Sequence, residues 1–361
     1  MSNLYIGVMS GTSLDGIDIT LCEIDKSVCK MLYSYEATFD ESVKEQILEM
    51  IEGQTTLREV GSLNSQLGHI FADALNDFLK KYAINPQDIT AIGLHGQTLW
   101  HEPDAKFAFS MQLGCPNVVS AKTGIKVIAD FRSMDIANGG EGAPFAPAFH
   151  KEIFASLQKN VAVVNIGGMA NITLLGEELK GWDSGCGNVL LDLWIQRTLN
   201  ERYDRDGAFA KRGRVEKQLL QSMLEDEYFK KLPPKSTGRE YFNQTWLERY
   251  LATFDTLSDV DIQRTLLELT AKSIVQDILK TSTKLIIVCG GGAKNGFLMQ
   301  RLKDLSQLEV QSSDTFGVSS DFMESMAFAW LAYKRVQREE VVLSDVTGAR
   351  KNSVLGGEYF N

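Results

Sequence analysis

The sequence predicts an α/β protein of two related lobes with a cleft between them. Its 361 residues, of which 44% are apolar, are many for one hydrophobic core and enough for two. Segments with the periodicities of strands and helices alternate along the chain. Each half also begins with two strands joined by a glycine turn, although no repeat of residues is visible.

The first half is expected to follow the order β-β-β-α-β-α-β. The turn S-G-T-S-L-D-G joins the first two strands, and a later buried strand ends at His95. Strands are expected at 4–9, 17–24, 30–39, 88–95 and 125–130, and helices at 41–51, 63–82 and 116–124. The loop at 129–147 is dense in Gly and Pro, and we expect it to be the crossing between domains.

The second half repeats this alternation. Strands are expected at 161–165, 171–175, 284–289 and 308–311, with helices over most of 188–279, at 295–305 and, as a final amphipathic helix, at 321–335. The polar interval 232–238 is predicted to be a surface loop. The predicted first lobe is therefore 1–133 together with a returning C-terminal segment at about 340–361, and the second lobe is 134–339.

The composition indicates a partner among small molecules. The formal net charge is −10, and Lys and Arg are scattered, which argues against a nucleic-acid or anionic-membrane surface. The five cysteines form no C-x-x-C pair and are odd in number, so reduced thiols in a cytoplasmic protein fit best. No leader-like start and no apolar run long enough for a bilayer are seen, so we expect a soluble, unexported chain.

Several nucleotide and metal classes are disfavoured by their missing signatures. The glycines near residue 290 do not match G-x-G-x-x-G, which disfavours a Rossmann dehydrogenase. No Gly-Lys dipeptide of a Walker-A loop occurs, nor do the H-R-D and D-F-G signatures of protein kinases. The four histidines lack the spacing of zinc ligands, and no metal-binding residue can be assigned.

The stretch 163–193 carries the strongest functional signal. It reads as a strand, a glycine turn at Gly167 and Gly168, a returning strand, and a loop with Asp183 that opens a helix near Asn188. Glycines let backbone N–H groups approach a phosphate, and a helix start adds a positive dipole end. A phosphate would repel Asp183 unless a metal, a water or a substrate hydroxyl lay between them, so this carboxylate suggests chemistry.

Two further glycine turns are candidate nucleotide sites. The turn 10–18 carries hydroxyls and two carboxylates, which suit a terminal phosphate and hydrated Mg²⁺, although a plain hairpin turn is the alternative. The triple glycine at 290–292 lies between a buried strand and a helix, where a flat ring or a phosphate could rest, although a tight βα connection would look the same.

The remaining polar candidates each have a structural alternative. His95 and Gln97 follow a buried strand, where a cleft would open, but a solitary histidine is more often structural. Arg132 is explained equally well by a salt bridge with Asp135 or by a substrate carboxylate. Glu324 lies on the final helix and could simply be solvated. Cys186 is expected to be a small buried thiol rather than a nucleophile.

Taken together, these motifs resemble the anhydro-N-acetylmuramic acid kinases of bacterial cell-wall recycling. The resemblance rests on G-V-M-S-G-T-S-L-D-G-I-D, G-L-H-G-Q-T-L-W-H, A-D-F-R-S-M-D-I-A-N-G-G-E-G-A-P, N-I-G-G-M-A-N-I-T, W-D-S-G-C-G-N and C-G-G-G-A-K-N, in order from residue 7 to about 295. It implies the fold shared by actin, hexokinase and the heat-shock chaperones' ATPase domain, in which each lobe contains a ribonuclease-H-like sheet. It also implies a cytoplasmic homodimer.

The resemblance implies that ATP, Mg²⁺ and water convert 1,6-anhydro-N-acetylmuramic acid to N-acetylmuramic acid 6-phosphate and ADP. Asp183 would be the general base. The ATP-binding residues would be Gly11, Thr12, Ser13, Leu14, Asp15, Gly16, Ile17, Asp18, Asn165, Gly167, Gly168, Gly290, Gly291, Gly292 and Asn295. The sugar-binding residues would be His95, Gln97, Arg132 and Glu324.

Two departures and two alternatives accompany this resemblance. The chain has Cys186 where the family commonly has proline and Glu141 where glutamine is common, and both concern loop geometry. A kinase of another anhydrosugar such as levoglucosan is one alternative. An ATP-binding switch of the chaperone or actin kind is the other, but such a switch needs no base like Asp183.

Overall fold

The computed structural model describes residues 3–11, 14, 16–26, 28–53, 55–157, 160–176, 179–233, 235–254 and 256–360. The chain forms two compact units, in which unit 1 comprises Met1–Ile153 with Phe322–Asn361 and unit 2 comprises Phe154–Asp321. The division falls after Ile153 rather than after residue 133, and before Phe322 rather than after residue 339. The loop at 129–147 is therefore part of unit 1 and not the crossing between domains.

Unit 1 is built on a six-stranded sheet in the order β13-β7-β4-β1-β2-β3. β1, β2 and β3 form an antiparallel meander, while β4 lies parallel to β1 and β7 lies parallel to β4. The strands are β1 (Leu4–Met9), β2 (Ile17–Asp25), β3 (Val28–Ala37), β4 (Ile89–Leu94), β7 (Val127–Ala129) and β13 (Gly357–Tyr359). β13 pairs with β7, so the C-terminal segment returns to this sheet.

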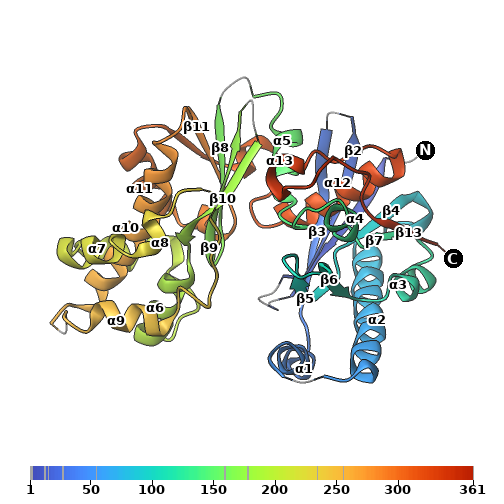
Figure 1. The fold of residues 1–361 in the computed structure, drawn as a ribbon, viewed down its shortest axis with the longest axis horizontal. Coiled ribbons are helices and arrows are strands. Elements are labelled where there is room, and N and C mark those ends of the chain that lie inside the picture. The colour runs from blue at the N-terminus through green and yellow to red at the C-terminus, as the bar shows by residue number, and fades with distance from the viewer. Residues whose placement is uncertain are drawn as a thin grey trace. The chain divides into compact units, whose positions relative to one another are not determined.

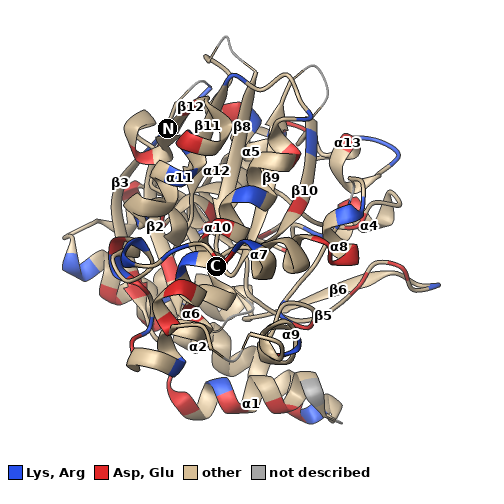
Figure 2. Ribbon diagram, turned by 90° about the vertical axis from the view of Figure 1, so that its left-hand side faces the viewer, with Lys and Arg blue, Asp and Glu red and all other residues tan. Residues whose placement is uncertain are grey.

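The helices of unit 1 follow from local sequence signals. α2 begins at a capping box of Thr56 and Glu59, and it buries Leu67, Phe71 and Phe78 along one face. The helices are α1 (Glu41–Glu52), α2 (Leu57–Lys81), α3 (Pro116–Thr123), α4 (Ser133–Ala137), α5 (Ala146–Ile153), α12 (Met323–Gln337) and α13 (Ser344–Thr347), with a 3-10 turn at Pro86–Asp88. Along α1, one basic residue lies among several acidic residues (Figure 2).

Glycines in the sheet of unit 1 allow α12 to pack closely on it. Gly7 of β1 and Gly93 of β4 are neighbours in the parallel register. A Cβ at Gly7 would overlap the carbonyl oxygen of Ser325, and a Cβ at Gly93 would overlap that of Phe328. The residues 325–333 of α12 are all buried, so the expectation of an amphipathic final helix is wrong.

One hairpin of unit 1 was not predicted. β5 (Gln97–Glu102) and β6 (Phe109–Leu113) form a separate two-stranded antiparallel sheet, which Figure 2 shows extending from the body of the unit. Its sequence is mostly polar and lacks the continuous apolar run of a buried strand.

Unit 2 repeats the sheet pattern of unit 1 on five strands, in the order β10-β9-β8-β11-β12. β8, β9 and β10 are antiparallel, and β11 and β12 continue in parallel. The strands are β8 (Val161–Ile166), β9 (Met169–Leu175), β10 (Leu179–Cys186), β11 (Leu285–Cys289) and β12 (Glu309–Ser312). Counted within each unit, both sheets therefore contain the order 3-2-1-4-5, the expected ribonuclease-H-like arrangement.

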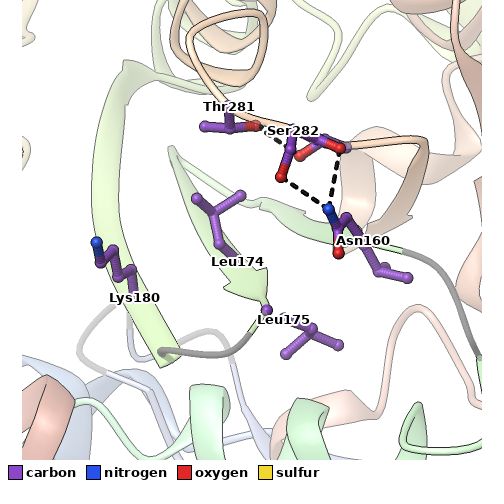
Figure 3. Close-up of a pocket in the computed structure, with 9 residues that line it drawn as sticks. Asn160, Leu174, Leu175, Lys180, Thr281 and Ser282 are labelled. Carbon is purple, nitrogen blue, oxygen red and sulfur yellow. Dashed lines mark hydrogen bonds between the residues drawn. The ribbon is translucent and has the colours of Figure 1, made fainter.

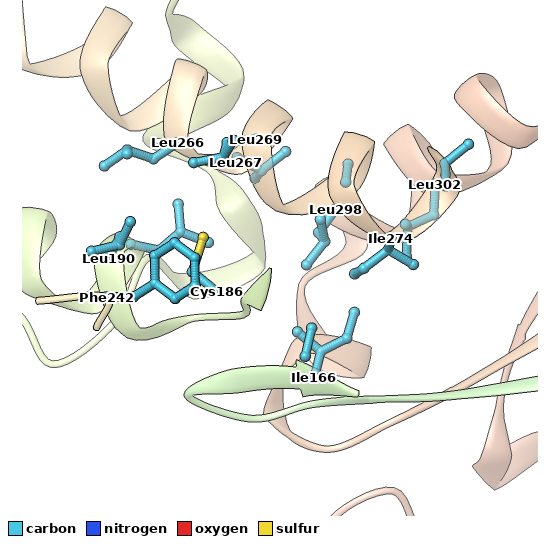
Figure 4. Close-up of a cluster of buried hydrophobic side chains, with 14 of the residues drawn as sticks. Ile166, Cys186, Leu190, Phe242, Leu266, Leu267, Leu269, Ile274, Leu298 and Leu302 are labelled. Atoms are coloured by element: carbon cyan, nitrogen blue, oxygen red, sulfur yellow. The ribbon is translucent and has the colours of Figure 1, made fainter. Parts of the chain in front are cut away.

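Helices of unit 2 pack around a core centred on α10. Figure 4 shows Leu266, Leu267 and Ile274 of α10 together with Leu190 and Phe242 in this buried cluster. The helices are α6 (Val189–Leu199), α7 (Lys217–Leu224), α8 (Glu227–Lys230), α9 (Gln244–Leu251), α10 (Asp259–Ile278) and α11 (Gly296–Ser306), with 3-10 turns at Arg205–Gly207, Ala210–Arg212, Gly291–Lys294 and Ser313–Phe316. Figure 1 shows the elements of each unit along the chain. None of the helices in the described ranges has the length and apolar character needed to cross a membrane.

Candidate active site

The predicted sugar-binding residues of unit 1 gather where β1 and β4 end. These strands are parallel, so Ser10 after β1 and His95 after β4 lie at the same edge of the sheet. The Ser10 hydroxyl donates to Oε1 of Gln97 over 2.6 Å, and the Ser10 carbonyl oxygen lies 3.2 Å from Nδ1 of His95. All three residues are buried. The structure therefore brings His95 and Gln97 together through Ser10.

The contacts of His95 define its protonation. Nδ1 faces a carbonyl oxygen and so carries the proton, while Nε2 accepts from Nη2 of Arg132 over 2.9 Å. Burial, assisted by the charge of Arg132, lowers the pKa of His95 to about 3. His95 is thus a neutral imidazole with a fixed orientation at physiological pH.

Arg132 is held by several protein groups in addition to His95. Its Nη1 donates to the carbonyl oxygen of Gly142 over 2.7 Å, and its guanidinium lies 5.1 Å from the ring centroid of Phe145. Nε is buried without a hydrogen-bond partner among the described residues. Burial lowers the pKa of Arg132 to about 10, against the opposing charge of Glu324.

The salt bridge between Arg132 and Asp135, one of the two alternatives, is not formed. The carboxylate of Asp135 instead accepts from the backbone N–H of Gly142 over 2.8 Å and from the hydroxyl of Thr347 over 2.9 Å. Of the two alternatives for Arg132, the salt bridge is therefore excluded, and the contact with a substrate remains a prediction.

Glu324 lies in the first turn of α12 and is an exposed residue. Loss of hydration at its carboxyl nevertheless raises the pKa of Glu324, although the charge of Arg132 opposes this rise. Glu324 thus interacts electrostatically with the arginine that contacts His95. This interaction connects it to the other predicted sugar-binding residues.

The glycine turn of unit 1 is described in part, because Thr12, Ser13 and Asp15 lie outside the described residues. The backbone N–H of Leu14 donates to the carbonyl oxygen of Gly11 over 3.2 Å. The side chains of Leu14 and Ile17 belong to the hydrophobic core, which leaves only their backbone for a phosphate. The remaining members of this predicted set are Gly16, whose added Cβ would lie 2.6 Å from the carbonyl oxygen of Ala37, and Asp18 at the start of β2.

In unit 2, the turn between β8 and β9 is fixed by its carbonyl groups. The carbonyl oxygen of Gly167 accepts from the backbone N–H of Asn188 over 2.8 Å, and that of Gly168 accepts from Gly187 over 2.9 Å. A Cβ at Gly187 would overlap the carbonyl oxygen of Gly167. The start of α6 therefore packs directly on the turn, and its first N–H groups donate to the turn carbonyls.

The triple glycine lies against the end of β8. Gly290 has φ 76°, in the left-handed region, and a Cβ there would overlap Oδ1 of Asn165. A Cβ at Gly292 would lie 2.5 Å from the side chain of Ile166. The predicted adenosine turn, in which Gly291 is the middle residue, thus adjoins the predicted phosphate hairpin.

Asn295 has a structural role that the sequence did not reveal. Its Oδ1 accepts from the backbone N–H of Leu298 over 3.0 Å and caps α11. The next residue, Gly296, donates its N–H to Oδ1 of Asp206 over 2.8 Å. Asp206 therefore belongs to the surroundings of this turn, although no motif drew attention to it.

Asp183 lies within β10 and not in a loop as expected. It pairs with Asn171 of β9, which in turn pairs with Asn165 of β8. Residues directly opposite each other on antiparallel strands share a face of the sheet. The three half-buried polar side chains therefore form a row across the sheet, and Asn171 is a candidate that the sequence analysis missed. A bulge at Ser184 follows directly.

The segment 235–237 holds the carboxylate of Asp183 by one oxygen. Oδ2 accepts from the Ser236 hydroxyl over 3.1 Å and from the backbone N–H of Thr237 over 3.0 Å. The backbone N–H of Asp183 donates to the carbonyl oxygen of Lys235 over 2.9 Å, and its carbonyl oxygen accepts from the Tyr228 hydroxyl over 2.8 Å. Within the described ranges Oδ1 has no partner, so it is available to accept a proton.

The electrostatic surroundings of Asp183 raise its pKa. Burial is the largest cause, and the charge of Glu240 acts in the same direction. The hydrogen bonds from Thr237 and Ser236 and the charge of Lys235 oppose this rise. A carboxylate with a raised pKa and one free oxygen has the properties of a general base.

The interval 232–238 is only partly the expected surface loop, because Lys235 is buried. Its Nζ lies 3.1 Å from Oδ2 of Asp277, with side-chain exposures of 2% and 4%. The same oxygen of Asp277 accepts from Nε1 of Trp182 over 3.0 Å, and Lys280 contacts the other oxygen over 3.0 Å. This ion pair anchors the segment that holds Asp183. A cluster of Lys, Ser, Thr, Gly and Arg after two prolines was the available signal.

The two residues that depart from the family pattern have definite surroundings. Cys186 is buried, and burial raises the pKa of its thiol to about 12, so it stays protonated as expected. Burial also raises the pKa of Glu141, with the charges of Asp104 and Asp135 acting in the same direction.

A cavity of about 370 Å³ lies at the end of the β8–β9 hairpin away from its glycine turn. Figure 3 shows Asn160, Leu174, Lys180 and Ser282 around it. It contains none of the predicted site residues. In the part of the chain that the structure describes, no group of three or more His, Cys, Asp and Glu side chains could hold a metal ion.

Two α/β units with ribonuclease-H-like sheets, glycine turns and a carboxylate beside them define the class of actin-like ATPases and sugar kinases. A solved structure, the (R)-2-hydroxyglutaryl-CoA dehydratase component A of Acidaminococcus fermentans, has a similar fold, with a TM-score of 0.50 at 10% identity over 93% of this chain and 100% of that one. Residues 3–361 match the family model of anhydro-N-acetylmuramic acid kinase, and the chain belongs to this family.

Curated relatives carry the same name. The chain is 52% identical to the anhydro-N-acetylmuramic acid kinase of Sulfurimonas denitrificans over 99% of this chain and 100% of the relative. It is 43% identical to that of Mannheimia succiniciproducens over 99% of this chain and 98% of the relative. The predicted family and the predicted enzyme class, a kinase, are thereby confirmed.

Proposed function

We propose that this kinase converts 1,6-anhydro-N-acetylmuramic acid, ATP and water to N-acetylmuramic acid 6-phosphate and ADP. The observation that supports this reaction is the carboxylate of Asp183, whose Oδ2 is anchored by Ser236 and Thr237 while Oδ1 has no partner in the described ranges. An ordinary sugar kinase activates a hydroxyl, whereas this reaction must also activate water at the anomeric carbon.

Asp183 acts as the general base. Oδ1 takes a proton from the water that forms a bond to the anomeric carbon, and the bond from this carbon to the bridging oxygen breaks. The bridging oxygen becomes O6 of the sugar and attacks the γ-phosphorus of ATP, from which ADP departs. Such proton transfer typically contributes about 10²–10⁴-fold to the rate.

The glycine turns bind the nucleotide. The turn at Gly167 and Gly168 and the backbone of the turn from Gly11 bind the ATP phosphates, because glycines expose backbone N–H groups to an anion. The turn at Gly290 binds the adenosine end. Mg²⁺ would neutralise phosphate charge, and it is usually held by phosphate oxygens, waters and one or two carboxylates, as in a complex that arrives with ATP.

The cluster at the ends of β1 and β4 binds the sugar. His95 is neutral and accepts a hydrogen bond from Arg132 at Nε2, so it contributes a fixed, uncharged surface to the sugar site. Gln97, Arg132 and Glu324 provide amide, cationic and anionic groups for a substrate with hydroxyls, an N-acetyl group and a lactyl carboxylate. We further propose a cytoplasmic location, where ATP is available, and a homodimer.

The test is product analysis in ¹⁸O-water with Mg-ATP. Product formed by the wild-type chain is reduced with borohydride at once, so that the oxygen on C1 can no longer exchange, and is then analysed by mass spectrometry. The expected product carries ¹⁸O on C1 and none in the phosphate ester. Asp183→Asn should lose at least about 10²-fold in rate.

Two controls define the outcome. Asp304→Asn, an exposed aspartate on α11, should keep the wild-type rate. Levoglucosan, which lacks the N-acetyl and lactyl groups, should be a poor substrate. If the wild-type chain forms no 6-phosphate from the muramic substrate, the proposed reaction is wrong. If Asp183→Asn keeps the full rate, the kinase assignment stands but Asp183 is not the base.

A further inference from the structure

Arg239 lies directly over the glycine turn between β8 and β9. A Cβ built at Gly168 would lie 3.7 Å from both Nε and Nη2 of Arg239. The guanidinium therefore faces this turn edge on, with two of its donor nitrogens equally close to Gly168. Arg239 itself is an exposed residue, so these donors are not enclosed in the core.

The charge of Arg239 is not neutralised by an ion pair. Among the described residues, no carboxylate forms a salt bridge with it. Its charge acts on Asp192 of α6, whose pKa burial raises to about 6 while Arg239 opposes the rise. An unpaired guanidinium over a glycine turn is a site where an anion gains favourable charge interactions.

The backbone of the same glycine offers a further donor. The N–H of Gly167 is used by the carbonyl oxygen of Met169 over 3.0 Å, and both glycine carbonyls hold the start of α6. The N–H of Gly168 has no acceptor in the described part of the chain. A backbone N–H and a guanidinium thus meet at one glycine, and each is a donor suited to a phosphoryl oxygen.

Arg239 extends from the segment that also holds Asp183. Lys235 anchors this segment through its buried ion pair with Asp277, and Ser236 and Thr237 bind Oδ2 of Asp183. The carbonyl oxygen of Gly238 accepts from the backbone N–H groups of Tyr241 and Phe242, both over 3.1 Å, which forms the turn that carries Arg239. These contacts fix the backbone from which the Arg239 side chain extends.

We propose that Arg239 binds the phosphoryl group that is transferred from ATP and stabilises its charge in the transition state. This inference rests on the proposed function and adds a residue to it. The planar guanidinium matches two phosphoryl oxygens at once, which an ammonium group does not. Because Arg239 and the ligands of Asp183 lie within five consecutive residues, one rigid segment places the proton acceptor and the phosphoryl-binding cation.

The test compares Arg239→Ala and Arg239→Lys with the matched control Arg197→Ala. Arg197 is an exposed arginine on α6, whose only described ion pair is a surface contact of 3.5 Å with Glu248. Arg239→Ala should reduce kcat by at least about 10²-fold, as expected for loss of a transition-state donor. Arg239→Lys should recover only a small part, and Arg197→Ala should keep the wild-type kcat. Both Arg239 variants should melt at the wild-type temperature, because no described ion pair is lost at Arg239. Arg197→Ala loses the exposed pair with Glu248 and a cation–π contact with Trp194, so it should melt within about 4 °C of the wild type.

Titrations with two nucleotides distinguish a contact of Arg239 with the transferred phosphoryl group from a general loss of nucleotide binding. Calorimetric titration with the non-hydrolysable analogue AMP-PNP and with AMP should show at least about tenfold weaker binding of AMP-PNP to Arg239→Ala and unchanged binding of AMP. Equal loss for both nucleotides, or unchanged kcat and unchanged AMP-PNP binding, would overturn the proposal. If the wild-type chain binds AMP-PNP but makes no 6-phosphate, the proposed reaction fails while the titration still tests Arg239.

Discussion

Removal of the buried charge of Lys235, in the segment that holds Asp183, is the most informative perturbation of unit 2. Lys235→Met keeps an unbranched side chain as far as Cε and removes the charged Nζ. Asp277 then loses the contact of 3.1 Å with Nζ of Lys235, although Trp182 and Lys280 still donate to its carboxylate. The variant therefore tests how much the chain depends on an ion pair with both partners buried.

The expected loss of stability follows from the burial of both Lys235 and Asp277. Removing one partner of a buried pair typically costs 3–5 kcal/mol, and because two donors to Asp277 remain, we expect about 3 kcal/mol. For a domain of this size, about 2–4 °C of melting temperature correspond to each kcal/mol, so the transition of unit 2 should fall by about 6–12 °C.

Differential scanning calorimetry at neutral pH measures this change, and Lys280→Met is the matched control. Lys280 contacts the other oxygen of Asp277 over 3.0 Å, but its side chain is 55% exposed. Exposed pairs contribute about 0–1 kcal/mol, so this control should melt within about 4 °C of the wild type.

Activity provides an independent readout of the same substitution. The charge of Lys235 lowers the pKa of Asp183, so Lys235→Met should move the acidic limb of kcat/KM to higher pH. If Lys235→Met melts together with Lys280→Met and its acidic limb stays in place, the reasoning about a buried cation that acts on the base is refuted.

Three further predictions concern single groups. Burial raises the pKa of Asp183, and the base must be ionised, so the acidic limb of the wild-type pH–rate profile should lie above the ordinary aspartate range. Ser236→Ala removes a hydrogen bond to the charged form and should move this limb to still higher pH. A limb that moves to lower pH in the variant would contradict this. His95 and His150 have pKa values of about 3 in the folded chain because of burial, so protonation of the unfolded chain should reduce stability as the pH falls from about 6.5 towards 3, by up to about 1.4 kcal/mol per pH unit for each histidine. In denaturant titrations of the wild type, His95→Gln and His150→Gln across this range, each substitution should remove the share of its own histidine, and a variant with an unchanged pH dependence would show that its ring is already charged when folded. Gly187→Ala should lower the free energy of unfolding by about 1–3 kcal/mol, because its Cβ would overlap the carbonyl oxygen of Gly167. Gly61→Ala is the control, because its added Cβ meets nothing within 4 Å and should not destabilise the chain. Thermal melting compares the two variants, and equal melting temperatures would contradict the close approach.

Local signals predicted most strands and helices of both units. The helix closed by Gly124 and the glycine-turned hairpins lie where the alternation of apolar residues and the turn residues indicated, whereas α2 begins at Leu57, six residues before the predicted start at residue 63. The 3-2-1-4-5 order of both sheets also agrees with the fold that the family resemblance implied. Such features depend on neighbours a few residues apart, which a sequence displays directly.

Features fixed by distant contacts were missed or misplaced. The loop at 129–147 joins unit 1 because Asp135 accepts a hydrogen bond from Thr347, more than two hundred residues later. Asp183 is predicted to lie in a loop, but pairing with Asn171 of β9 places it in β10. Ser236 and Thr237 lie in the interval 232–238, which the sequence predicts to be a surface loop, since the burial of Lys235 depends on its distant partner Asp277.

The packing of α12 on Gly7 and Gly93 has a consequence for synthesis of the chain. Unit 2 is continuous, so all its residues have emerged from the ribosome once Asp321 is clear of the exit tunnel. Unit 1 begins first but needs α12 to cover β1 and β4 and then β13 to complete its sheet edge. The N-terminal strands must therefore wait with an uncovered apolar face while the later unit folds, which reverses the usual N-to-C order of domain folding.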